Sequence, residues 1–172
     1  MAAWHIGDEH EIHIGGDIVH ACKLYFYASA DTMWLKTVGW EIVSETANFY
    51  ASRIVQDNAT KQFTFKNVIC PDEKAGIQND NPFTNAIARE TMTFAALIAR
   101  KFNFTANSLW DRYSENMLIL KPIQLPGSGK KLIHPEYAGY GKCNIFIRSS
   151  QSLLIFDFLE ESLLMFDFLN EF

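Results

Sequence analysis

Residues 82–102 read PFTNAIARETMTFAALIARKF, and this stretch decides the fold class. Pro82 stands in the first turn of a predicted helix, where a residue without an amide hydrogen is tolerated. Apolar side chains then recur at steps of three and four residues, which is one face of a helix. They are Ile87, Met92, Phe94, Ala95, Leu97 and Ile98. The stretch therefore predicts a long amphipathic helix.

Two further helices are predicted before it. The first covers residues 17–30, with one apolar face made of Ile18, Ala21, Cys22, Tyr25 and Ala28. Asp31-Thr32 then offers side-chain oxygens that can cap a second helix. This second helix runs to Ile54 and carries Leu35, Val38, Ile42, Thr46, Phe49, Tyr50 and Ile54. The short link between the two predicts an antiparallel αα-hairpin.

Loops and short segments fill the rest of the chain. Residues 60–65 suggest a short extended segment, and the brief apolar run of residues 68–73 is broken by Pro71. A shorter helix is expected over residues 108–118, with Asn107 as its cap. The sequence as a whole predicts an all-α protein with polar loops between paired helices.

Length and composition limit the classes of protein to which the chain can belong. The 172 residues, 48% of them hydrophobic, suffice for one domain with its own core. The net charge of -5 without a basic cluster argues against nucleic acid or an anionic membrane as partner. No apolar stretch approaches the roughly 20 residues that span a bilayer. We therefore expect a soluble protein, and a cytoplasmic location is favoured because residues 1–9 do not resemble a signal peptide.

Histidine is frequent near the N-terminus, which raises the question of a metal site. Glu11 and His13 lie near three more histidines, His5, His10 and His20, but the spacing matches no recognised ligand pattern. The three cysteines are widely spaced and form no CxxC pair. We expect neither a metal nor a cofactor.

The C-terminal residues contain the one repeat in the sequence. Residues 152–160 read SLLIFDFLE, and residues 162–170 read SLLMFDFLN. A helix of this composition would be apolar around most of its circumference, so we expect this tail to pack on other helices or to self-associate.

Three polar motifs accompany the predicted helices. The first is Glu11-Ile-His-Ile-Gly-Gly-Asp17, and it continues as Phe49-Tyr-Ala-Ser-Arg53 at the end of the second helix. The second is Pro71-Asp72-Glu73, followed by the Asn-rich residues 79–85. The third is Ile133-His-Pro-Glu-Tyr-Ala-Gly-Tyr140.

In order and spacing these motifs resemble family 65 of the glycoside hydrolases, the trehalase-like and disaccharide phosphorylase family. The resemblance covers about residues 8–141. It implies a partial (α/α) six-hairpin toroid, an incomplete barrel, over residues 1–141, and a divergent tail over residues 142–172. The third motif is similar to the animal branch, whose members remove glucose from glucosylgalactosyl-hydroxylysine of collagen-type chains.

The resemblance implies an α-glucoside as substrate and Glu73 as the general acid of an inverting enzyme. Such an enzyme needs a protonated carboxylic acid at the leaving oxygen and, as a hydrolase, a carboxylate base across the sugar. The base would lie outside this chain. Substrate contacts are expected from Glu11, Asp72, Asn79, Asn81, Thr84 and Asn85. The alternative for the Asn, Asp and Thr residues is that they stabilise turns and cap helices.

The sequence departs from the family at two places. Lys74 and Ala75 stand where the family has Tyr and His, and Lys142 is followed by Cys143 instead of Gln. The first change is expected to weaken substrate binding. Three functions stay open: a fragment of an α-glucosidase, a non-catalytic helical remnant that at most binds sugar or a partner, and a disaccharide phosphorylase.

Overall fold

A computed structural model describes residues 7–71, 75–124 and 132–140. Expectations for Asp72, Glu73, Lys74 and the repeated tail therefore lie outside the described residues. The helices are α1 (Gly7–His10), α2 (His13–Ser29), α3 (Thr32–Trp34), the π-helical turn η2 (Leu35–Gly39), α4 (Trp40–Arg53), α5 (Pro82–Phe102) and α6 (Trp110–Glu115). The strands are β1 (Val55–Gln56), β2 (Phe63–Thr64), β3 (Val68–Ile69), β4 (Ile77–Gln78), β5 (Ile123–Gln124) and β6 (Leu132–Ile133).

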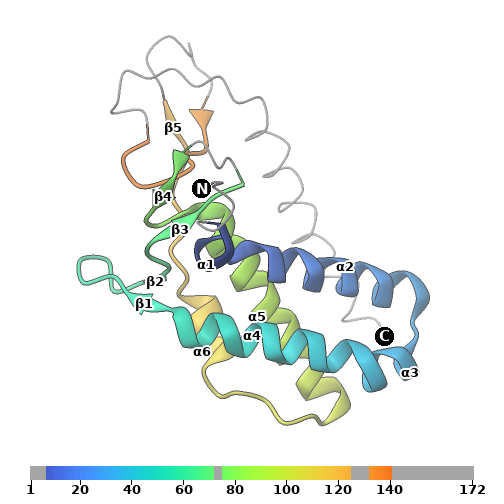
Figure 1. The fold of residues 1–172 in the computed structure, drawn as a ribbon. Coiled ribbons are helices and arrows are strands. Elements are labelled where there is room, and N and C mark those ends of the chain that lie inside the picture. Colours follow the sequence, from blue (N-terminus) through green and yellow to red (C-terminus); the bar gives the residue numbers. More distant parts are fainter. Residues whose placement is uncertain (1–6, 72–74, 125–131, 141–172) are drawn as a thin grey trace.

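Helices dominate the described part of the chain. α2 and α4 run side by side in opposite directions, joined through α3 and η2, and α5 packs against both (Figure 1). The strands form three antiparallel two-stranded ribbons, β1–β2, β3–β4 and β5–β6. These ribbons lie toward one end of the helices (Figure 1). The predicted all-α class is confirmed, and the β3 segment lies in a small ribbon and not in the centre of a sheet.

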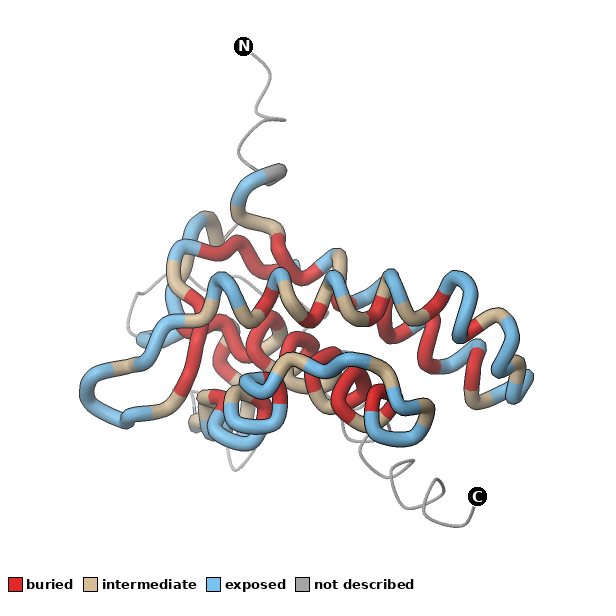
Figure 2. Tube along the Cα trace, turned by 90° about the horizontal axis from the view of Figure 1, so that it is seen from below, coloured by how far each residue is buried: buried red, intermediate tan, exposed pale blue. Residues whose placement is uncertain are grey.

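α5 has the bounds that the sequence predicts, and its expected apolar face is buried except for Leu97, which is half-buried. The Asn81 side chain caps it by accepting a hydrogen bond from the Thr84 amide at 2.7 Å. The helix ends at Asn103, which adopts the left-handed conformation with φ 56°. α5 forms the centre of the red, buried part of the tube in Figure 2.

α2 buries a different face from the one that its apolar residues predict. Ile18 is 51% exposed and Tyr25 is 46% exposed, and of the predicted face only Cys22 is buried. The buried side of the helix instead includes His13, His20 and Lys23. The prediction was wrong because periodicity locates an apolar stripe but not the element that covers it. On this side of α2, His20 and Lys23 contact a charged residue of α5, Glu90.

The second predicted helix is interrupted near its start. Leu35–Gly39 form a π-helical turn between α3 and α4. Gly39 is needed there, because a Cβ atom would lie 2.8 Å from the Trp34 ring. The cap predicted at Asp31 is confirmed, since its carboxylate accepts from the Trp34 amide at 2.9 Å. α6 is shorter than predicted, and the Asn107 side chain accepts from the Leu109 amide beside its start.

Within the described residues, no helix is long and apolar enough to cross a membrane.

Candidate functional site

The beginnings of α2 and α5 lie close together, which joins the first and second motifs. The rings of His13 and Phe83 meet edge to face, with their centroids 5.6 Å apart. Tyr50 of α4 ties the second half of the first motif to the same place. Its buried hydroxyl accepts from the Gly16 amide at 2.9 Å and donates to the Ile12 carbonyl at 2.9 Å.

Gly16 permits this close approach of three helices. A Cβ atom at this position would lie 2.6 Å from Ile87 of α5 and 2.7 Å from the Tyr50 hydroxyl. Both distances are shorter than van der Waals contact allows, so any larger side chain would push α2 away from its neighbours. The Gly-Gly step in the first motif therefore sets the spacing of the helices that carry the candidate site.

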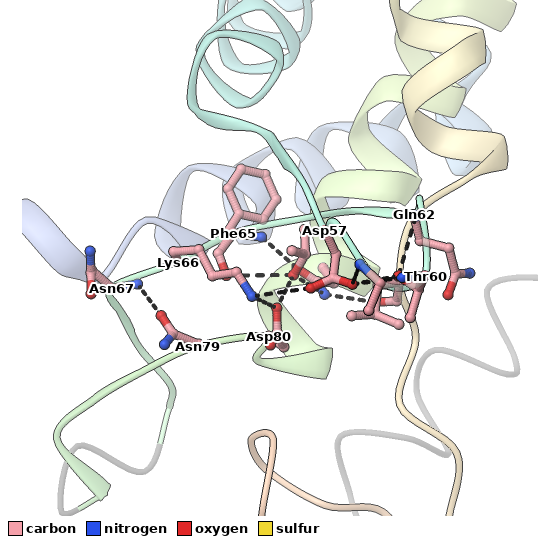
Figure 3. Close-up of polar contacts among 12 residues, drawn as sticks. Asp57, Thr60, Gln62, Phe65, Lys66, Asn67, Asn79 and Asp80 are labelled. Atoms are coloured by element: carbon pink, nitrogen blue, oxygen red, sulfur yellow. Dashed lines mark hydrogen bonds and ion pairs between the residues drawn. The ribbon is translucent and has the colours of Figure 1, made fainter.

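The β3–β4 ribbon lies at this end, and the segment that connects its two strands in the sequence contains Asp72 and Glu73. Side chains join residues 66–67, just before β3, to residues 79–80, just after β4 (Figure 3). We call these four residues the foot of the ribbon. The Asn79 side chain accepts from the Asn67 amide at 2.9 Å, and Lys66 donates to the Asp80 carboxylate at 2.5 Å. Asp80 adopts the left-handed conformation with φ 59°, and its amide donates to the Phe65 carbonyl. These contacts hold the two ends of the ribbon together where it joins the helices.

The third motif packs on the same foot. The Asn81 side chain donates to the Glu136 carbonyl at 2.6 Å, and the Ala138 amide donates to the Asn79 carbonyl at 3.3 Å. His10, the residue just before the first motif, reaches the same place, since its Nδ1 donates to the Asn67 carbonyl at 2.7 Å. The second and third motifs and the residue that precedes the first are therefore in contact around the base of the β3–β4 ribbon.

Three of the predicted sugar contacts are fully buried within the protein. Asn85 donates to Thr64 Oγ1 at 3.0 Å and to the Leu118 carbonyl at 2.7 Å, and its oxygen lies 3.3 Å from the Phe65 amide. Asn81 caps α5, and Thr84 lies in the first turn of that helix. These contacts match the alternative of capping and loop support. Asn79 is exposed beside the ribbon, and a sugar contact there stays a prediction.

Glu11 lies on a cavity of about 400 Å³. The cavity is bounded by Glu9, His10 and Glu11 on one side and by Phe49 and Arg53 of α4 on the other. Sequence reasoning selected Glu11 but missed Phe49 and Arg53 as lining residues. The signal was present, because both close the second half of the first motif.

A buried ionic cluster lies between α2 and α5, farther along the helices. Glu90 Oε1 accepts from Lys23 at 2.7 Å and from His20 Nδ1 at 2.9 Å. Lys23 is only 2% exposed. Burial opposes the charge on Glu90, but the hydrogen bond from His20 and the Lys23 ammonium outweigh it and lower the pKa of Glu90. The cluster holds the two helices in register.

The described histidines do not assemble a metal site. Across residues 7–71, 75–124 and 132–140, no three His, Cys, Asp or Glu side chains are grouped so that they could hold a metal ion.

Comparison with known proteins identifies the motif set. Residues 1–150 match the family model for the central catalytic domain of glycosyl hydrolase family 65. The chain belongs to glycosyl hydrolase family 65. The predicted family is thus confirmed, and the described helices are part of the helical toroid of that family.

The relatives include hydrolases and phosphorylases. The chain is 32% identical over 131 residues to the protein-glucosylgalactosylhydroxylysine glucosidase of Gallus gallus, covering 76% of this chain and 18% of the relative. It is 42% identical over 112 residues to the kojibiose hydrolase of Mucilaginibacter mallensis, covering 64% of this chain and 16% of the relative. The chain thus spans less than a fifth of these relatives.

A solved structure from the human microbiome, assigned as a kojibiose phosphorylase, shares the fold. The TM-score is 0.54 at 25% sequence identity, over 62% of this chain and 17% of the other. The names of these three proteins all concern carbohydrates.

Proposed function

We propose that the chain is a piece of the catalytic domain of an inverting α-glucosidase, with Glu73 as its general acid. The observation that carries the proposal is that the second and third motifs meet at the foot of the β3–β4 ribbon, together with His10 just before the first motif. The segment between β3 and β4 contains Glu73. A general acid needs a fixed position at the leaving oxygen. The hydrogen bonds of Asn67, Asn79 and Asp80 at the foot join the residues before β3 to those after β4, on either side of the segment that contains Glu73.

The proposed substrate is glucosylgalactosyl-hydroxylysine or a disaccharide such as kojibiose or a trehalose-like sugar. Glu73 would protonate the leaving oxygen, while a carboxylate from another part of the catalytic domain would activate water on the opposite face of the sugar. Asp72 and Asn79, next to the acid and at the foot of its ribbon, would contact the sugar.

Two alternatives have support of their own. The chain spans 18% of the Gallus gallus relative, which favours a non-catalytic remnant for the chain by itself. The likeness to a protein assigned as a kojibiose phosphorylase favours a phosphorylase, in which phosphate replaces the water and its base.

The isolated chain should release no glucose from trehalose, kojibiose or glucosylgalactosyl-hydroxylysine, because one acid without a base cannot complete an inverting hydrolysis.

The proposed function is tested with a chimeric enzyme. In the kojibiose hydrolase of Mucilaginibacter mallensis, the segment that this chain matches is replaced by this chain's residues. We expect the chimera to release glucose from kojibiose, measured with a coupled glucose assay.

The unmodified hydrolase is the positive control, and circular dichroism verifies that the chimera is folded. A folded chimera without activity would contradict the proposed function. Glucose release by the isolated chain that Glu73→Gln abolishes would contradict the prediction that the isolated chain is inactive.

A further inference from the structure

The two halves of the first motif, 38 residues apart from Glu11 to Phe49, face each other across one cavity. One wall comes from α1 and the start of α2, and the other comes from the end of α4. The volume of about 400 Å³ falls within the roughly 300–1,000 Å³ that is usual for small-ligand sites. The cavity therefore has room for a ligand of the size of a sugar.

The charges around the cavity favour a neutral ligand. Glu9 and Glu11 contribute two carboxylates, and Arg53 contributes one guanidinium. Two carboxylates repel an anion, and the guanidinium partly offsets the attraction that they exert on a cation. A sugar hydroxyl both donates and accepts hydrogen bonds, so it can donate to a carboxylate and accept from Arg53. A polyhydroxylated neutral molecule satisfies both kinds of group at once.

Phe49 and Arg53 form a platform of the kind that sugars contact. Phe49 is 43% exposed, although it is a large apolar side chain. The Arg53 guanidinium lies 6.0 Å from the centre of the Phe49 ring, a cation–π contact that orients it. An exposed ring offers an apolar face to the C–H groups of a sugar, and the adjacent guanidinium offers several donors.

His10 connects this cavity to the candidate active site. Its Nδ1 donates to the Asn67 carbonyl at the foot of the β3–β4 ribbon. In the neutral imidazole the other ring nitrogen is then an acceptor. The cavity thus lies one side chain away from the ribbon whose turn includes Glu73.

We propose that this cavity binds one hexose unit of a neutral oligosaccharide, with Arg53, Phe49 and Glu11 as its main contacts. The inference deepens the proposed function and rests on it for the class of ligand. It adds Arg53 and Phe49 as binding residues, and binding here needs no proton from Glu73.

The test is a titration of the full chain with kojibiose, followed by the amide signals in ¹H–¹⁵N NMR spectra. We expect saturable shifts for residues 9–15, 49 and 53. Arg53→Gln should weaken the affinity about tenfold or more, because it removes a charged hydrogen-bond donor. Glu11→Gln should weaken it as well, which provides a second, independent variant.

Arg112→Gln is the matched control. Arg112 is also an exposed arginine beside an aromatic ring, 5.4 Å from the centre of Phe63, but it does not line the cavity. Its variant should bind kojibiose as the unchanged chain does. Absence of saturable shifts in the cavity would overturn the inference, and so would equal weakening by Arg112→Gln or equal binding of sorbitol.

The proposed function and the proposed sugar-binding cavity can each be disproved without the other. If kojibiose fills the cavity but the chimera cleaves nothing, the proposed function is wrong and the binding site stands. If the chimera cleaves kojibiose but the cavity does not bind it, this inference is wrong and the proposed function stands.

Discussion

In the kojibiose hydrolase chimera, Glu73→Gln should lower the rate of glucose release from kojibiose by about 10²–10⁴-fold. Glutamine keeps the size and planar shape of the side chain and still forms hydrogen bonds, but its amide has no acidic proton to give to the leaving oxygen. Loss of a general acid therefore slows the chemical step while the protein remains folded. The rate is measured at saturating substrate with the coupled glucose assay.

An activated substrate separates an acid from a structural residue. An aryl α-glucoside with a strongly acidic phenol leaves without protonation, so the Glu73→Gln chimera should cleave it at a rate much nearer to that of the unchanged chimera. Asp72→Asn is the matched neighbour, because side chains of adjacent residues usually point apart. The Asp72→Asn chimera should show no such recovery of the rate on the activated substrate. Equal losses on both substrates would show that Glu73 is not the acid.

Glu90→Ala should lower the free energy of unfolding of the chain by about 3–5 kcal/mol, because it removes the carboxylate from a buried ion pair. Lys23, at 2% exposed, would lose the hydrogen bond of 2.7 Å to Glu90, and His20 would lose the one of 2.9 Å. Urea denaturation followed by circular dichroism measures the change.

Asp111→Ala is the control, since it breaks the Arg100–Asp111 pair, whose side chains are 59% and 56% exposed. An exposed pair of this kind contributes about 0–1 kcal/mol. Similar losses in the two variants would contradict the role of burial in the Lys23–Glu90–His20 cluster.

The same cluster predicts a pH dependence. The folded protein holds the pKa of Glu90 below its ordinary value of 4.5. A lowered pKa stabilises the folded state above the ordinary value, and this contribution is lost as the pH falls through the folded-state pKa. Below about pH 4.5 the unchanged chain should therefore lose stability more steeply than Glu90→Gln.

Local sequence signals predicted α5 well because its determinants are local. The cap at Asn81, Pro82 in the first turn and the repeating apolar face all lie within the helix or next to it. The buried face of α2 could not be predicted in the same way. It depends on Glu90, which lies 67 residues from Lys23 in the sequence, and a charged residue on a helix is ordinarily expected to face solvent.

The sequence predicts which motifs contribute to the candidate site, but it does not predict the role of each residue in them. The order of the motifs indicated the family, yet Asn81 and Asn85 turn their polar groups to the protein. Phe49 and Arg53 were read as part of a helix end, because only the fold brings them opposite Glu11.

The stereochemistry of the first product tests the central claim most directly. An inverting α-glucosidase with one acid and one distant base releases glucose as its β-anomer. ¹H NMR spectra taken in the first minutes of kojibiose cleavage by the chimera distinguish the anomers before they interconvert. The account predicts that β-glucose appears first and α-glucose follows by mutarotation. Initial release of α-glucose would contradict it, because retention requires a nucleophile that forms a covalent intermediate.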